Sequence, residues 1–224
     1  ETWTNDYIEI PFYNCESVTW ATALGSLIDA AKEQFPAARW NTPETILSIS
    51  DYNRLATMYG KETFELKEDE YLVVCNFLLL QELRDRNLAQ GGTQQVGNTV
   101  LKPALPKCEE GYLMMSGTSS NTGILILPDA VIEKEQGVIY RVGSVMSGNY
   151  SVKGREEIKE INDRLWDAVS TYTVYNYMNE NPIPPMFFET GMDIRESNNG
   201  LTMIVAFLVI YVGVVFLIAS AAML

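Results

Sequence analysis

The chain has 224 residues and contains no histidine. Imidazole is the usual base in Ser-His-Asp and Cys-His arrangements and a frequent ligand in zinc sites, so its absence excludes the hydrolases and metalloenzymes that need it. Cysteine is scarce as well, since the three cysteines are Cys15, Cys75 and Cys108. Their odd number and the lack of C-x-x-C spacing argue against a metal knuckle or a full disulfide framework. We expect buried thiols, and the sequence leaves open whether one pair is oxidised, and which.

The sequence also lacks a nucleotide-binding loop. No G-x-x-x-x-G-K-[ST] motif occurs, and Gly60-Lys61 is followed by Glu62, so this chain does not itself cradle a nucleotide triphosphate. Residues 117–123 are rich in glycine and hydroxyl side chains, but a strand-like run follows them, whereas a phosphate loop opens a helix. We interpret this segment as a hairpin turn. No catalytic, cofactor-binding or metal-ligating residue is predicted, and no cofactor; we expect that the chain is not an enzyme.

Charge is distributed unevenly along the chain. The 16 basic and 29 acidic side chains give a net charge of −13, and all of them lie in residues 1–200. This excess of negative charge opposes binding to nucleic acid or to an anionic lipid surface. Acidic clusters occur at residues 68–70, 109–110 and 156–157. Paired carboxylates or a calcium site are one reading, but no cluster has the D-x-[DN]-x-[DN]-G ladder, so we interpret them as solvated surface.

The last 24 residues carry no charge and read LTMIVAFLVIYVGVVFLIASAAML. As a helix they would extend about 36 Å, against roughly 30 Å of bilayer hydrocarbon. Their leucine, isoleucine, valine and phenylalanine side chains favour membrane insertion by on the order of 4 to 8 kcal/mol. The alternative is a fully buried helix of a large soluble core, which the preceding residues would have to wrap on all sides. We predict one transmembrane helix at residues 201–224.

The residues before this segment predict an α+β domain. The mixed order of strands and helices differs from a repeating βαβ pattern. A cap at Ser50 or Asp51 and another at Asp129 are expected to begin two of the helices. The expected strands are residues 7–13, 46–49, 71–75, 123–127 and 137–145. Helices are expected from residue 17 to Pro36, after the cap at Ser50 or Asp51, from residue 130, and from 155 to 169. Hairpins are expected within residues 91–123.

Three regions are predicted along the chain. The proline-rich residues 181–185 favour an extended connector, so the folded domain is expected to occupy residues 1–185. A juxtamembrane connector then covers residues 186–200 and the transmembrane helix covers 201–224. Because the chain starts at Glu1 with no leader sequence, we expect it to be a piece of a longer protein.

The end of the sequence resembles a known family. The residues that carry the resemblance are TGMDIRE at 190–196, Gly200-Leu201, YVG at 211–213 and FLIASAA at 216–222. They resemble the span that re-enters the membrane after the large extracellular domain of FtsX-like ABC transporter permeases, particularly the bacitracin-resistance (BceB-like) branch of Gram-positive bacteria. Similar pieces occur in the same order upstream, at residues 50–53 with Gly60, at 66–71 and at 123–129. Residues 1–45 match nothing in this family, and their role is not predicted.

This resemblance implies a permease with further transmembrane helices and a separate ABC ATP-binding subunit, often beside a sensor histidine kinase. It places residues 1–200 outside a bacterial cell membrane, with the C-terminus toward the cytoplasm, and makes peptide antibiotics or their lipid-linked targets the expected ligands. It transfers no catalytic residue. Two rival hypotheses are an FtsX-like permease that transports lipoproteins or activates wall hydrolases, and a membrane-anchored extracellular enzyme that uses carboxylates.

Overall fold

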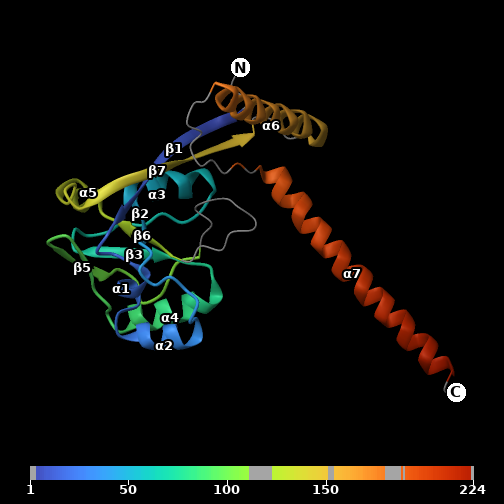
Figure 1. Cartoon of the computed structure of the whole chain (residues 1–224), viewed down its shortest axis with the longest axis horizontal. Coiled ribbons are helices and arrows are strands. Elements are labelled where there is room, and N and C mark those ends of the chain that lie inside the picture. Colours follow the sequence, from blue (N-terminus) through green and yellow to red (C-terminus); the bar gives the residue numbers. More distant parts are fainter. Residues whose placement is uncertain (1–3, 111–122, 151–153, 180–187, 189, 223–224) are drawn as a thin grey trace. The chain divides into compact units, whose positions relative to one another are not determined.

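The structure is a computed structural model that describes residues 4–110, 123–150, 154–179, 188 and 190–222. These residues belong to two compact units. The first, which we call the sheet unit, contains residues 4–110 and 123–149. The second, which we call the helical unit, contains the residues from 150 onward (Figure 1).

The sheet unit is organised around one mixed sheet of seven strands in the order β4-β5-β3-β6-β2-β1-β7. β2 runs parallel to β6, and β3 runs parallel to β5. β3 is antiparallel to β6, β4 to β5 and β1 to β2. The strands are β1 (Thr4–Cys15), β2 (Thr45–Ser48), β3 (Glu70–Val74), β4 (Gln94–Val96), β5 (Thr99–Pro103), β6 (Ile124–Leu127) and β7 (Ile139–Tyr150).

Short helices cover both faces of this sheet. In Figure 1, α3 lies on one side of it, and α1, α2 and α4 lie on the other. The helical elements of the sheet unit are α1 (Trp20–Leu24), the 3-10 turn η1 (Gly25–Leu27), α2 (Ile28–Gln34), α3 (Ile49–Met58), α4 (Leu78–Ala89) and α5 (Asp129–Lys134).

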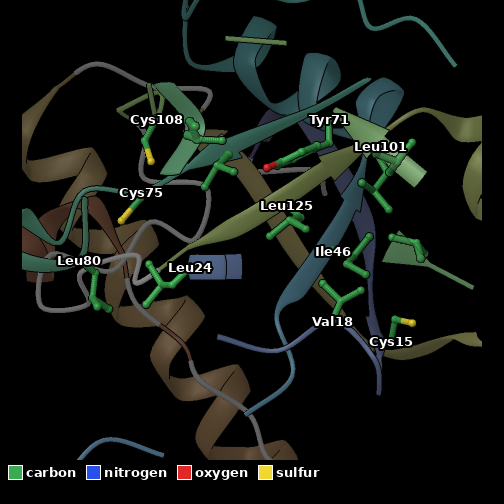
Figure 2. Close-up of a cluster of buried hydrophobic side chains, with 14 of the residues drawn as sticks. Cys15, Val18, Leu24, Ile46, Tyr71, Cys75, Leu80, Leu101, Cys108 and Leu125 are labelled. Atoms are coloured by element: carbon green, nitrogen blue, oxygen red, sulfur yellow. The ribbon is translucent and has the colours of Figure 1, made fainter. Parts of the chain in front are cut away.

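The central strands are apolar on both faces because each face has its own core. Tyr71 and Val73 of β3 pack in the cluster that includes α4 and α5 residues, part of which Figure 2 shows. Leu72 and Val74 of the same strand pack in the other cluster, with α3. Side chains alternate along a strand, so a strand covered on both sides reads as one unbroken apolar run. This confirms the expected α+β domain and the buried strands read from such runs.

The first predicted helix is interrupted. A single helix was expected from residue 17 to Pro36, but α1 ends at Leu24 and η1 and α2 follow. Gly25 has φ 53°, a conformation that only glycine adopts readily. Asn87 of α4 donates a hydrogen bond to the Ala23 carbonyl over 3.0 Å and so replaces the partner that a continuous helix would supply. The helix pattern was right, but a contact from a distant residue divides it.

The predicted caps of α3 and α5 are wrong. Ser48 caps α3, because its side chain accepts from the Asp51 N–H over 3.1 Å, and β2 therefore passes into α3 without a loop. Pro128 occupies the N-cap position of α5, and Asp129 is the first helical residue. The Asp129 carboxylate instead accepts from the Ser50 hydroxyl over 2.7 Å, joining the starts of the two helices.

Residues 76–90, to which the sequence assigned no element, contain α4. Its inward face mixes leucines with the buried polar residues Arg84 and Asn87, and this mixture hides the apolar periodicity that identifies a helix. A hairpin expected within residues 91–123 is present as β4 and β5, with Gly97 at φ 57° in its turn. Residues 111–122 of the same segment and the proline-rich segment 181–185 lie outside the described residues.

The helical unit contains α6 (Arg155–Met178) and α7 (Gly191–Ala222). α6 extends nine residues beyond the predicted end at Val169, and it carries an ion pair between Glu160 and Arg164 with a 2.6 Å N–O distance. The sequence assigned residues 155–169 to the N-terminal domain, whereas α6 is grouped with α7. α7 begins ten residues before Leu201, inside the predicted connector.

Within the part of the chain that the structure describes, no helix combines the length and apolar content needed to cross a bilayer. The transmembrane helix expected at residues 201–224 stays a prediction.

Candidate functional site

The largest exposed apolar surface among the described residues lies on α7. Large aliphatic and aromatic side chains are exposed at consecutive positions, so they point to all sides of the helix rather than along one stripe. A helix that is apolar all round is normally buried in a large core or in a bilayer. Those more than 45% exposed are Met203, Ile204, Val205, Phe207, Leu208, Val209, Ile210, Tyr211, Val212, Val214, Val215 and Phe216.

The start of α7 is fixed by a polar cap. The Asp193 N–H donates to the Thr190 hydroxyl over 3.2 Å, and the Thr190 N–H donates to Asp193 Oδ2 over 3.0 Å. This reciprocal pair is a capping box, which satisfies N–H groups that the first helical turn leaves free. The motif TGMD at residues 190–193, which is part of the family resemblance, therefore has a local structural role.

The same carboxylate joins α7 to α6. Trp166 Nε1 of α6 donates to Asp193 Oδ2 over 3.0 Å, and the Trp166 ring makes an edge contact with Phe188 at a centroid distance of 5.0 Å. Partial burial acts to raise the pKa of Asp193, but hydrogen bonds from Thr190, Trp166 and Asn162 hold that pKa below its ordinary value. Asp193 is thus an ionised link between the two helices of the helical unit.

A second unusual feature is a charged pair inside the sheet unit. Arg84 Nη2 of α4 lies 2.6 Å from Glu44 Oε1, and the two side chains are 2% and 0% exposed. Burial raises the pKa of Glu44. Burial also opposes the charge of Arg84, but the Glu44 carboxylate offsets it and the pKa of Arg84 is raised. Gly123 packs on this guanidinium so closely that a Cβ there would lie 2.3 Å from Cζ, and its φ of 149° also favours glycine.

The Glu44–Arg84 pair is incompletely satisfied. Glu44 Oε2 and the Nε and Nη1 atoms of Arg84 have no hydrogen-bond partner among the described residues. A buried ion pair stabilises a fold only where its remaining polar atoms are also paired, so this pair is weak support for stability and sensitive to loss of either partner.

Two of the three cysteines lie beside this pair. The charge of Arg84 acts on the thiols of both Cys75 and Cys108. Hydrogen bonding from Cys108 and then the Arg84 charge lower the pKa of Cys75, whereas hydrogen bonding to Cys75 and burial raise the pKa of Cys108. All three cysteines are buried, as the sequence predicted. Figure 2 shows Cys15 at the opposite end of the same core cluster.

In the predicted acidic cluster at residues 68–70, two side chains form ion pairs. Asp69 lies 2.7 Å from Lys102 Nζ, and Glu70 lies 3.0 Å from Lys67 Nζ. In the described ranges, no group of three or more histidine, cysteine or acidic side chains is arranged to hold a metal ion. Most of the glycine-rich segment predicted as a turn, residues 117–122, lies outside the described residues.

An open depression of about 590 Å³ lies on the sheet unit. Its lining includes the cations Lys32 and Arg39 and the indole of Trp40, whose buried Nε1 has no partner among the described residues. No paired acid and base or convergent nucleophile lines this depression, so its geometry indicates no reaction.

Sequence reasoning found the apolar surface of α7 but missed the Glu44–Arg84 pair. The available signal was weak: Arg84 falls four residues after Leu80, which would place both on one side of a helix, and Glu44 directly precedes a buried strand. A charge on the inward side of a predicted helix indicates a buried partner, but it does not identify one.

Comparison of the chain with protein-family models, with curated proteins and with solved structures finds no match.

Proposed function

We propose that this chain is the extracellular α+β domain and the adjoining transmembrane helix of an FtsX-like ABC transporter permease, of the peptide-antibiotic resistance and sensing type. The observation that carries the proposal is the exposure of large apolar side chains at consecutive positions of α7. Burying one such side chain is worth about 1.5 to 3 kcal/mol, so a helix that exposes them on every side requires an apolar environment.

Lipid and neighbouring membrane helices meet this requirement better than the sheet unit does. The two core clusters of the sheet unit already cover both faces of its sheet. Phe216 is the last large apolar side chain of α7 that is described as exposed, and the sequence continues without charge from there to Leu224. A span of this length matches the hydrocarbon thickness of a bilayer.

The link between α6 and α7 supports a mechanical role. Because Asp193 both caps α7 and accepts a hydrogen bond from Trp166, a displacement of α7 along or about its axis acts directly on α6. In the proposed permease, a separate ATPase would drive the membrane helices, and α7 would transmit that motion to the extracellular residues. This division agrees with the lack of a nucleotide-binding loop in the sequence. The remaining transmembrane helices, and in some systems a sensor histidine kinase, would complete the assembly.

Negative charge makes a cationic peptide antibiotic the favoured ligand class, with a lipid-linked target as the other candidate of the resistance branch. All 29 acidic side chains would lie on the extracellular side of a bacterial cell membrane, where they would raise the local concentration of a cationic peptide. Such attraction is screened over about 10 Å at 0.1 M salt. Binding of a cationic peptide antibiotic to the full chain in nanodiscs should therefore weaken strongly between 0.05 and about 0.5 M salt. Salt-independent binding would reject the electrostatic part of the proposal.

Membrane insertion is tested by one charge placed on α7. The full chain should remain with the membrane fraction after alkaline carbonate extraction. The substitution Val209→Arg should reduce that fraction, because arginine at the centre of a span costs about 2.5 to 3.5 kcal/mol on the insertion scale. Thr63→Arg, at an exposed position of the sheet unit, is the matched control and should leave extraction unchanged. Equal extraction of all three proteins into the soluble fraction would contradict the proposal.

A further inference from the structure

The loop that lines the depression on the sheet unit is held in place by backbone hydrogen bonds to α1. The Ala21 N–H donates to the Trp40 carbonyl over 2.9 Å. The Trp20 N–H donates to the Thr42 carbonyl over 3.0 Å. Within the loop, the N–H and the hydroxyl of Thr42 both donate to the Arg39 carbonyl, over 3.0 and 2.7 Å. The loop is therefore pre-organised, which spares a ligand the entropic cost of ordering it.

Two cations line this depression without a counter-ion. Lys32 belongs to α2 and Arg39 to the loop that follows it. Both residues are exposed, and neither forms an ion pair with a carboxylate in the part of the chain that the structure describes. At 0.1 M salt, exposed charges more than about 10 Å away are largely screened. The two cations therefore attract an anion locally, although the chain as a whole is acidic. The other lining residues are uncharged: Ala38, Trp40, Asn41 and Thr42.

The wall of the depression also contains a buried donor without an acceptor. Trp40 is 8% exposed and belongs to the core cluster that includes Val18 and Ile46, so its indole ring is fixed by packing. Its Nε1 has no hydrogen-bond partner among the described residues. A buried indole N–H usually has a partner, because an unpaired donor loses the hydrogen bond that it makes with water in the unfolded chain. A ligand oxygen that accepts from Trp40 would recover this loss.

From these observations we propose that the depression binds a phosphate group through Lys32, Arg39 and Trp40. A phosphate group carries a charge of about −1.5 to −2 at pH 7 and three strong acceptor oxygens. The Arg39 guanidinium can hold two of these oxygens at once, and the Lys32 ammonium provides a second positive charge. The indole N–H of Trp40 and the side-chain amide of Asn41 are further donors. A carboxylate has one charge and two oxygens, so it would leave more of these donors unpaired.

The ligand is either a free phosphate or a phosphate carried by a small organic molecule, since a volume of about 590 Å³ accommodates both. The inference does not rest on the proposed function. The lining residues lie between positions 32 and 42, in the part of the sequence without resemblance to FtsX-like permeases, and all of them belong to the sheet unit.

The indole N–H of Trp40 provides a direct readout. The chain contains four tryptophans, so isotope labelling of tryptophan alone gives a simple proton–nitrogen correlation spectrum of the full chain. Dodecyl maltoside is the suitable detergent because it contains no phosphate. The variant Trp40→Phe identifies the Trp40 signal. Titration with inorganic phosphate at constant ionic strength should move this signal downfield and saturate in the millimolar range, with the Trp166 signal unchanged.

Variants of the two cations test their roles. Arg39→Gln should weaken phosphate binding about tenfold or more, because it removes a charge-assisted hydrogen bond. Lys32→Gln should weaken binding as well. Lys61→Gln changes an exposed lysine outside the depression, so it is the matched control and should leave the affinity unchanged. Unchanged Trp166 and Trp20 signals in the phosphate-free spectra establish that each variant is folded.

A second probe distinguishes the two sources of phosphate. Tighter binding of phenyl phosphate than of inorganic phosphate would assign the site to an organic phosphate, and equal or weaker binding would assign it to the free ion. The proposal would be overturned if neither probe moved the Trp40 signal saturably, if acetate bound as tightly as phosphate, or if Arg39→Gln bound phosphate as the wild type does. None of these readouts depends on membrane insertion, so their failure leaves the proposed function unaffected.

Discussion

The sheet unit and α7 are both rich in large aliphatic side chains, but they place them in opposite environments. Leu125 and Leu127 of β6 are fully buried, each in a core between the sheet and its covering helices, whereas Phe207 and Phe216 of α7 are both 69% exposed. The sheet unit buries its apolar side chains between its sheet and helices, whereas α7 exposes its apolar side chains. This difference, rather than any catalytic group, is the feature of the molecule that points to function.

The largest effect is expected from breaking the buried charged pair of the sheet unit. Arg84→Met leaves the Glu44 carboxylate buried without its partner, which should cost about 3 to 5 kcal/mol of unfolding free energy. Chemical denaturation of the full chain in detergent, followed by near-UV circular dichroism, measures this loss. The double substitution Glu44→Gln, Arg84→Met should recover part of it. A single variant as stable as the wild type would show that the pair is solvated.

The next substitution contrasts buried and exposed leucines directly. Leu125→Ala should destabilise the sheet unit by about 2 to 5 kcal/mol, because it leaves a cavity in a closely packed core. Leu208→Ala on α7, where the side chain is 54% exposed, should change the same unfolding free energy by less than about 0.5 kcal/mol. Equal losses in the two variants would mean that α7 contributes to the core of the sheet unit.

Alkaline pH should weaken the sheet unit through Tyr71. Burial raises the pKa of Tyr71 to about 12, and its hydroxyl donates to the Gly92 carbonyl over 2.6 Å. The neutral phenol therefore contributes stability that is complete below pH 10 and is lost as the pH rises toward 12, on the order of 3 kcal/mol. The stability difference between wild type and Tyr71→Phe should shrink over this interval. Tyr140→Phe, at an exposed position of β7, serves as the control, and a pH-independent difference for Tyr71→Phe would refute the assignment.

The smallest effect is expected at the start of α7. Thr190→Ala removes the hydroxyl of the capping box and should cost about 1 kcal/mol of local stability. Acid should also weaken the cap. Because the pKa of Asp193 is lowered, the stability that its carboxylate contributes is present above its ordinary pKa of 3.8 and is lost as the pH falls through the lowered value. Amide hydrogen exchange of residues 190–193 measures both changes. Unchanged exchange rates would show that the cap does not hold the helix start.

The sequence predicted those parts of the fold that depend on local pattern. Unbroken apolar runs identified β3 and β6, and the uncharged tail identified the apolar helix. The sequence did not predict features that depend on contacts between distant residues. The helix break at Gly25 involves a hydrogen bond from Asn87, and the buried Arg84 interrupts the apolar pattern by which α4 could have been predicted. The bridge between Val74 and Glu109 joins segments far apart in the chain, so no local pattern could predict it.

The environment of α7 is measured most directly by spin labels in liposome-reconstituted full chain, introduced through Val209→Cys or Thr63→Cys. The three native thiols are buried and should not compete for the label under native conditions. We predict that the label at position 209 collides readily with oxygen and rarely with a water-soluble nickel complex, with the opposite result at position 63. If the label at position 209 were as accessible to nickel as the one at position 63, α7 would lie in water and the account would be wrong.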